Sequence, residues 1–195
     1  APGDAGPFEV VTKVPAGADP RGSLAASLGR LRRGRVAGLI AHDAADLLGP
    51  GGDGFFAAMD ELRAAGLAER IGASVYAPEQ AGELLDRYPL TLLQLPLNVF
   101  DQRALAGDLL RRARERSVAV HARSVFLQGL LLMEPERLPA VLARARPALT
   151  AFHARARELG RTPVQAALAF ARSQPGVDLV LCGVNDVAQR AELLR

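Results

Sequence analysis

The chain has 195 residues, 49% of them hydrophobic, and a formal net charge of +3, which fits one globular domain and excludes a disordered protein. No apolar run reaches the roughly 20 residues that span a bilayer and no signal peptide is recognisable, so we expect a cytoplasmic protein with no membrane partner. One cysteine excludes an internal disulfide, three histidines lack metal-ligand spacing, and dispersed arginines form no patch for a nucleic-acid partner.

Strand-like apolar runs alternate with helical periodicity along the whole chain. The strand signals fall at 8–14, 36–41, 70–76, 90–95, 117–122 and 178–182. The helical signals fall at 24–31, 55–65, 78–88, 105–116, 139–159 with an interruption at Pro147, 163–172 and the C-terminal end. This alternation predicts parallel βαβ units in an α/β fold, either an open doubly wound sheet or a barrel.

Lys13 is the only lysine in a chain whose other basic side chains are 23 arginines, from the stated total of 24. Arginine keeps its proton in a protein, whereas a lysine amine in a dry pocket can shift its pKa and take part in chemistry. Lys13 is therefore the first candidate for a chemical role. The alternative is a solvated strand end on which this lysine has no function.

Polar side chains stand at or just beyond the C-terminal end of successive predicted strands. They are Lys13, His42, Ser74, Gln94, the pair Arg123 and Ser124, and Asn185. In a parallel barrel these strand ends share one face, which carries the active site. Each residue taken alone has a structural explanation, such as a core position for His42 or a turn for Ser74. Six coincidences at six strand ends favour a site.

Six sequence runs, each weak alone, together resemble the aldo/keto reductases. They are FEVVTKVP at 8–15, GLIAHD at 38–43, RIGASVY at 70–76, QLPLNVFDQR at 94–103, RSVFLQG at 123–129 and GVNDVAQRAE at 183–192. The resemblance covers essentially all of the chain. It implies a parallel TIM-type (β/α) barrel and the reduction of a small-molecule aldehyde or ketone by hydride from NADPH, with NADH possible.

By the same resemblance, Lys13 and His42 correspond to two catalytic residues of the family. Lys13 would lower the pKa of a tyrosine acid, and His42 would orient the substrate carbonyl. This agrees with the physics, because hydride addition builds negative charge on an oxygen that a cation and a hydrogen-bond donor stabilise.

The other matched positions imply contacts with the cofactor, and no metal. Ser74 and Gln94 would hold the nicotinamide carboxamide, and Arg123 stands where many members stack an aromatic residue on the ring. Ser124, Phe126 and Gly129 resemble the loop around the pyrophosphate. Asn185, Gln189 and Glu192 resemble the segment that grips the adenosine end.

Two positions depart from the pattern of the family. Val75 stands where many members have an asparagine that bonds the carboxamide. Gln189 stands where a phosphate-binding arginine is common, which leaves the choice between NADPH and NADH open, and Arg190 beside it could substitute.

The first two βα units of the family, with its catalytic aspartate and tyrosine, have no counterpart here, and neither Tyr76 nor Tyr88 matches that tyrosine. We therefore expect residues 1–195 to form a single truncated domain, an incomplete barrel with six of the eight strands, numbers 3 to 8. Six strands cannot close a barrel built for eight, so open sheet edges could lead to self-association.

Three smaller features give weaker indications of function. The glycine-rich run at 49–54 lacks the Lys-Ser/Thr pair of a P-loop and predicts a loop before a helix. His121 lies in an apolar strand and is expected in the core, whereas His153, on an arginine-rich helix, is expected to be exposed.

Three functions stay open at this point. The first is an NAD(P)H-dependent carbonyl reductase, and the second is a nucleotide-binding protein without catalysis, since the acid is missing. The third is a lyase in which Lys13 forms a Schiff base with a carbonyl substrate.

Overall fold

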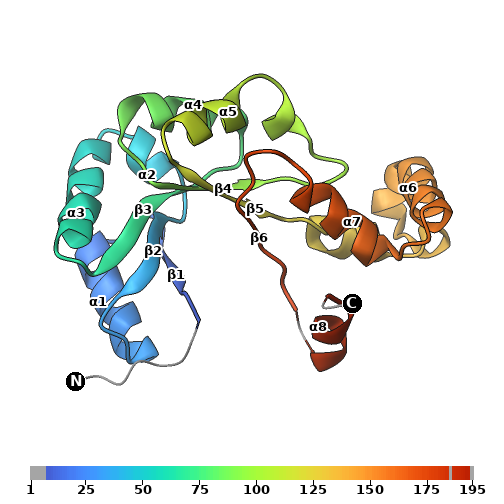
Figure 1. Ribbon diagram of the computed structural model, residues 1–195, viewed down its shortest axis with the longest axis horizontal. Coiled ribbons are helices and arrows are strands. Elements are labelled where there is room, and N and C mark those ends of the chain that lie inside the picture. Colours follow the sequence, from blue (N-terminus) through green and yellow to red (C-terminus); the bar gives the residue numbers. More distant parts are fainter. Residues whose placement is uncertain (1–7, 185, 194–195) are drawn as a thin grey trace. The chain divides into compact units, whose positions relative to one another are not determined.

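The computed structural model describes residues 8–184 and 186–193, in which strands and helices alternate as expected (Figure 1). Six strands hydrogen bond in the order β1-β2-β3-β4-β5-β6, and the pairs from β1 to β4 are parallel. The α/β class and the open six-stranded sheet are thereby confirmed. The chain divides into two compact units, residues 1–95 with 103–121 and residues 96–102 with 122–195.

The first unit contains most of the sheet and its covering helices. Its elements are β1 (Val11–Val14), α1 (Pro20–Leu31), β2 (Val36–Ala41), α2 (Ala45–Leu48), α3 (Gly52–Ala64), β3 (Ala68–Ser74), α4 (Pro78–Arg87), β4 (Leu92–Pro96), a 3₁₀ turn at Arg103–Leu105, α5 (Leu109–Glu115) and the start of β5 (Ala119–Arg123).

The second unit begins at the ends of β4 and β5. Its elements are three 3₁₀ segments, η2 (Leu127–Leu132), η3 (Pro135–Arg137) and η4 (Ala140–Ala145), followed by α6 (Arg146–Glu158), α7 (Pro163–Arg172), β6 (Leu179–Val180) and α8 (Val187–Leu193).

Local sequence explains where several helices begin. Asp19 accepts a hydrogen bond from the backbone of the first turn of α1, whose first residue is Pro20, so this helix begins earlier than the expected residue 24. Thr162 and Gln165 form a reciprocal capping box at the start of α7. The helical stretch 139–159 divides next to Pro147, as expected: η4 ends at Ala145 and α6 begins at Arg146, so Pro147 is the second residue of α6, where it needs no N–H.

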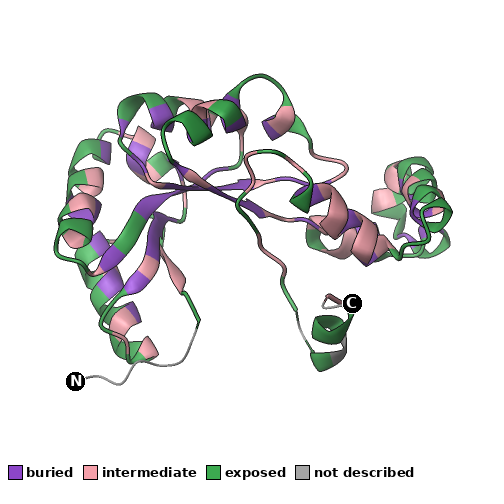
Figure 2. Ribbon diagram, in the orientation of Figure 1, coloured by how far each residue is buried: buried purple, intermediate pink, exposed green. Residues whose placement is uncertain are grey.

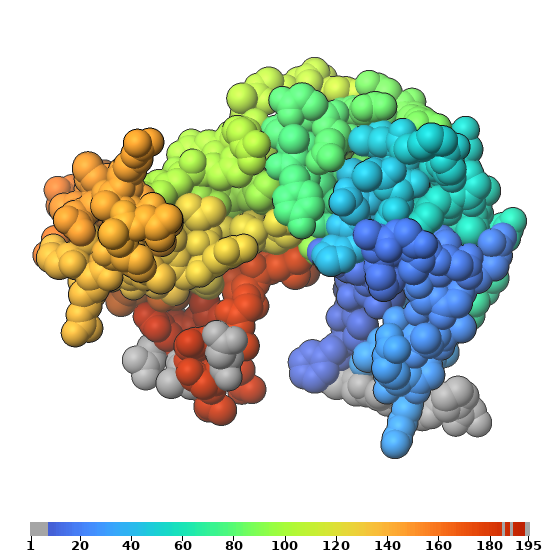
Figure 3. Space-filling model, turned by 180° about the vertical axis from the view of Figure 1, so that it is seen from behind, coloured from blue at the N-terminus to red at the C-terminus, as the bar shows by residue number. Residues whose placement is uncertain are grey.

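The core of the first unit lies between one face of β1–β3 and the helices. Val14, Leu39 and Ile71 alternate onto this face and pack with Leu24 of α1 and Met59 of α3. Figure 2 shows the resulting run of buried residues along β2 and β3. From behind, the side chains of α1 (blue) and α3 (cyan) lie next to one another (Figure 3).

The opposite face of β1–β4 carries Lys13 and Ser74 together with apolar residues and glycines. Lys13, Ile40 and Gly72 are partners across three strands, and Ser74 lies two residues further along β3. A Cβ added to Gly38 would stand 2.9 Å from Cδ2 of Leu92 and 3.1 Å from Cγ2 of Val11. A Cβ at Gly72 would overlap the backbone of Leu92 outright. These two glycines therefore give Leu92 the room to reach across β3 towards β2.

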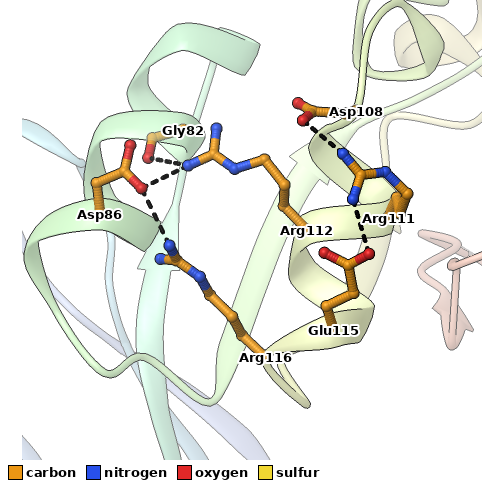
Figure 4. A network of polar contacts seen from close by, with 7 residues as sticks. All are labelled: Gly82, Asp86, Asp108, Arg111, Arg112, Glu115 and Arg116. Atoms are coloured by element: carbon orange, nitrogen blue, oxygen red, sulfur yellow. Dashed lines mark hydrogen bonds and ion pairs between the residues drawn. The ribbon is translucent and has the colours of Figure 1, made fainter.

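Helices α4 and α5 are joined by a charged network (Figure 4). The Asp86 carboxylate on α4 accepts from Arg112 at 2.6 Å and from Arg116 at 3.2 Å, and Arg112 also donates to the Gly82 carbonyl. The hydrogen bond from Arg112 is the main cause of the lowered pKa of Asp86. Exposed ion pairs contribute little to stability, so the network chiefly fixes how the two helices lie against one another.

The histidines divide between a confirmed and a wrong expectation. His121 on β5 is buried, as expected. The expectation that His153 is exposed is wrong, since only 8% of its surface is accessible. It lies on the buried face of α6 with Leu149 and Ala156, and its Nε2 is 2.9 Å from the Leu131 carbonyl oxygen. Along 8–184 and 186–193, no helix has the length and apolarity that crossing a membrane would require.

Candidate functional site

The first unit brings Lys13 and Ser74 together. Lys13 lies on β1, β2 runs between it and β3, and its Nζ donates to Oγ of Ser74 at 3.3 Å. The contact crosses β2 because Lys13 and Ser74 alternate onto the same face of the sheet, where Gly72 presents no side chain. Ser74 is 2% exposed, so the ammonium meets a buried hydroxyl.

Gln94 and His42 stand on the strands beside this pair. Gln94 on β4 is buried and is the register partner of Ser74. The backbone carbonyl oxygen of Gln94 accepts a hydrogen bond from the Val75 amide at 2.9 Å. Val75 itself is fully buried. His42 follows β2 directly, where its amide donates to the Val14 carbonyl oxygen at 2.9 Å, and its side chain is exposed. Four of the residues expected from the sequence thus occupy neighbouring strands of one unit.

The second unit holds the loop after β5, whose backbone is unusual. Ser124, Leu127, Gln128 and Gly129 all have positive φ, at 59°, 48°, 54° and 91°. Such conformations cost free energy in residues other than glycine and gather at functional sites. Two of its amides bond inside the loop, that of Leu127 to the Ser124 carbonyl oxygen at 2.8 Å and that of Gly129 to the Phe126 carbonyl oxygen at 2.9 Å.

Asn98 holds this loop in place. Its side chain is 1% exposed, and its Nδ2 donates to the Ser124 carbonyl oxygen at 3.1 Å. Its Oδ1 accepts from the amides of Phe100 and Asp101, both at 2.9 Å. Arg123 adds a bond from Nη1 to Oγ of Ser124 at 3.1 Å. Ser124 is therefore fixed through its backbone and its hydroxyl.

A pocket of about 680 Å³ opens beside the loop, wholly within the second unit. Five residues expected at the cofactor line it: Ser124, Phe126, Gly129, Gln189 and Glu192. Gly183 lines it too, and a Cβ added to Gly129 or Gly183 would meet no atom within 4 Å. The space beside the backbone is therefore open at both glycines.

Helix α8 presents one of its faces to this pocket. Gln189, Glu192 and Leu193, spaced three and four apart, line the pocket, whereas their neighbour Arg190 does not. Asn185, expected at the adenosine end, lies outside the described residues. The charged residues that line the pocket within the described ranges are Glu134 and Glu192.

The two tyrosines have different surroundings. The Tyr88 hydroxyl donates towards the Leu47 carbonyl oxygen, 2.9 Å away, and the Asp53 carboxylate, 2.8 Å away, while its ring stacks on Phe56 at 4.6 Å. Burial, followed by the bond to Asp53, raises the pKa of Tyr88 to about 12. Tyr88 is therefore a structural phenol. Tyr76 lies just beyond β3 with 56% of its surface exposed.

Two residues of this region escaped sequence reasoning. Asn98 stood inside a run that resembles the family, but nothing local showed that its amide reaches a loop 26 residues away. Glu134 follows η2 and lines the pocket only because the chain folds back there.

Cys182 is half-buried, and burial raises the pKa of its thiol. Over the part of the chain that the structure describes, no three metal-ligating side chains gather.

Known proteins were compared with this chain and fold. Residues 21–195 match the model of the aldo/keto reductase family. No curated protein sequence matches the chain at a significant level. A solved glycerol dehydrogenase from Gluconobacter oxydans is 24% identical with a TM-score of 0.72, and the match covers 89% of this chain and 57% of that one.

An aldo-keto reductase from Bacillus halodurans is similar in both its solved forms. The apo form is 22% identical with a TM-score of 0.76, over 94% of this chain and 64% of the other. The holo form is also 22% identical, with a TM-score of 0.77 over 96% and 65%. The chain thus spans 57 to 65% of the length of the solved structures that it matches.

Proposed function

Because the chain belongs to the aldo/keto reductase family, we propose that it forms part of an NAD(P)H-dependent oxidoreductase that reduces an aldehyde or ketone to an alcohol. One observation carries the proposal: the pocket of the second unit is lined by five of the residues that the family resemblance assigns to the cofactor. We also propose, as the sequence predicts, that residues 1–195 act as one reductase domain.

The residues that line the pocket would hold the cofactor, as the family resemblance implies. Ser124, Phe126 and Gly129 would surround the pyrophosphate, and Arg123, which bonds to Ser124, would stack on the nicotinamide ring. Gln189 and Glu192 would hold the adenosine end. For Ser74 and Gln94, two buried hydrogen-bonding groups of the first unit, the resemblance alone implies the role of holding the carboxamide. When bound, the cofactor supplies the hydride.

Lys13 would lower the pKa of a tyrosine acid, as the family resemblance implies, and His42 would act on the carbonyl oxygen. The Lys13 side chain donates a hydrogen bond to Oγ of Ser74 at 3.3 Å, so its amine is positioned at the end of β3 before negative charge develops on the substrate oxygen. His42, which leaves the adjacent strand at the same edge, would donate a hydrogen bond that orients the carbonyl.

A second candidate is nucleotide binding without turnover. It is favoured by the position of Tyr88, whose hydroxyl is committed to Leu47 and Asp53 and cannot serve as a proton donor to a substrate. Tyr76 is the remaining tyrosine of the sequence. This candidate predicts cofactor binding with no oxidation of NADH or NADPH in the presence of any carbonyl compound.

Two measurements test the proposal. NADH and NADPH are titrated against the protein by the enhancement of their fluorescence, and their oxidation is followed with a panel of aldehydes and ketones. Lys13→Met should abolish oxidation and preserve binding. Thr12→Val is the matched control, because Thr12 lies next to Lys13 but faces α1, where it contacts Ser27. Oxidation by the Lys13 variant at the unaltered rate would refute the assignment.

The lyase alternative is tested on the same residue. Borohydride reduces an imine to a stable amine, so a carbonyl compound linked to Lys13 would add its mass to one peptide after reduction. A reductase forms no such imine, and we expect no added mass on Lys13.

A further inference from the structure

A smaller cavity of the second unit lies between η3 and α6, and we call it the α6 cavity. Its volume is about 370 Å³, and its polar lining consists of Glu134, Glu136, Thr150, His153 and Arg157. Arg146 of α6 joins the two elements, since its Nε donates to the Pro135 carbonyl oxygen at 3.0 Å. Among the polar residues of this lining, Glu134 alone also lines the pocket beside the loop after β5. The α6 cavity is therefore a separate space with no part in the proposed function.

His153 contributes a buried ring to this cavity. Its side chain is 8% exposed, and its Nε2 lies 2.9 Å from the Leu131 carbonyl oxygen. A carbonyl oxygen only accepts hydrogen bonds, so Nε2 carries a proton and Nδ1 of the neutral ring carries a lone pair. Nδ1 bonds to no residue of 8–184 or 186–193, yet protein atoms do not enclose it, so it faces the cavity that the ring lines. An N–H or O–H group of a ligand would complete its bonding.

The two walls of the α6 cavity carry opposite charges. Glu134 and Glu136 belong to the η3 wall, as the residue that precedes η3 and a residue within it. The α6 wall carries Thr150, His153 and Arg157, whose spacing of three and four residues places them on one face of the helix. The η3 wall is therefore acidic, and the α6 wall ends in a guanidinium.

These charges are available to a ligand. Glu134, Glu136 and Arg157 are exposed, and none of them forms an ion pair with another residue that the structure describes. A carboxylate only accepts hydrogen bonds and a guanidinium only donates them. The η3 wall thus suits a cationic group with N–H donors, and Arg157 suits an anionic group with paired oxygens.

Ligands of one charge fit this lining poorly. A simple anion would approach Arg157 together with two carboxylates, and a simple cation would approach the carboxylates together with a guanidinium. A metal ion fits no better, because in the described ranges no three side chains are grouped as metal ligands. A molecule with one charge of each sign would meet a complementary partner on both walls. The volume lies near the lower end of the roughly 300–1,000 Å³ of small-molecule pockets, which favours a small ligand.

We propose that the α6 cavity binds a small zwitterion with an ammonium and a carboxylate group, of which free amino acids are the simplest class. The ammonium donates hydrogen bonds to Nδ1 of His153 and to the carboxylates of Glu134 and Glu136. The carboxylate pairs with the Arg157 guanidinium. This site goes beyond the proposed function, because it needs neither the cofactor nor the carbonyl substrate.

The test compares whole zwitterions with their halves. Glycine, β-alanine and 4-aminobutanoate, which differ in the separation of their charges, are titrated alongside acetate and methylammonium. We expect at least one zwitterion to bind about tenfold or more tightly than either half, which corresponds to about 1.4 kcal/mol. Binding is followed by ¹⁵N nuclear magnetic resonance of the three histidines, with His153 assigned by its loss in His153→Gln. The Nδ1 signal of His153 should shift as its lone pair accepts a hydrogen bond.

Variants locate the ligand. Arg157→Gln should weaken binding of the best zwitterion about tenfold or more, and Glu136→Gln should weaken it too. Neither residue lines the larger pocket, so both variants should bind NADH like the unaltered protein. Arg155→Gln is the matched control, because Arg155 lies on the same helix outside the cavity, where its Nη1 pairs with Glu158 at 2.9 Å.

Three results would each overturn the proposal. They are zwitterions that bind no more tightly than acetate and methylammonium, an equal effect of Arg157→Gln and Arg155→Gln, and an Nδ1 signal of His153 that stays in place during the titration. None of them bears on the reductase, which is tested by nucleotide binding and by oxidation of NADH or NADPH.

Discussion

Replacing Asn98 with alanine should destabilise the loop that carries Ser124. The side chain makes three hydrogen bonds at 2.9 to 3.1 Å and is 1% exposed, so water cannot replace the lost partners. Each such bond contributes about 0.5–1.5 kcal/mol net. The Asp101 amide keeps a bond to the backbone oxygen of residue 98, so two bonds are lost without replacement and the expected loss is about 1 to 3 kcal/mol.

The loss is measured by urea denaturation followed by far-ultraviolet circular dichroism, because the chain has no tryptophan to report by fluorescence. The midpoint should fall while the slope stays constant. Gln102→Ala is the control in the same segment: its exposed amide donates only to the Val99 carbonyl oxygen, at 2.8 Å, and its loss should cost less than about 0.5 kcal/mol. Equal effects of the two substitutions would refute the argument that burial makes Asn98 matter.

Two further predictions concern Tyr88 and Gly129. The folded protein raises the pKa of Tyr88 from 10.0 to about 12, so its contribution to stability is present below pH 10 and lost as the pH rises from 10 to 12; Tyr88→Phe should lack this alkaline loss in urea midpoints. Gly129→Ala should cost about 1 kcal/mol or more because φ is +91°, and should also weaken NADH binding, whereas Gly107→Ala, with φ +78° in the first unit, should cost a similar amount without changing binding.

The sequence predicted the bounds of an element best where a single hydrophobic pattern marked it clearly. β2 was expected at 36–41 and lies at Val36–Ala41, since its apolar run is bounded by polar residues. α2 was missed because four residues are too short to show periodicity. His153 was misplaced because its neighbouring arginines suggested solvent, although the spacing of Leu149, His153 and Ala156 marks one buried face.

The candidate site, like the fold, could be predicted from the sequence only in part. Alternation along parallel strands suffices to bring Lys13 and Ser74 onto one face, so their approach follows from sequence and fold class. The roles assigned to these residues stay predictions. Asn98 and Glu134 could not be found, since their significance depends on which distant backbone or pocket the chain folds them against.

The two glycines on β2 and β3 set a limit on how this site can evolve. The side chains of Leu92 and Val11 pack against Gly38 on the face of the sheet that also carries Lys13 and Ser74. A side chain at Gly38 would crowd that leucine and Val11, and one at Gly72 would separate β3 from β4. The packing on the sheet face that carries Lys13 and Ser74 is therefore set by the backbone at these two positions, and should stay constant among relatives that keep both glycines.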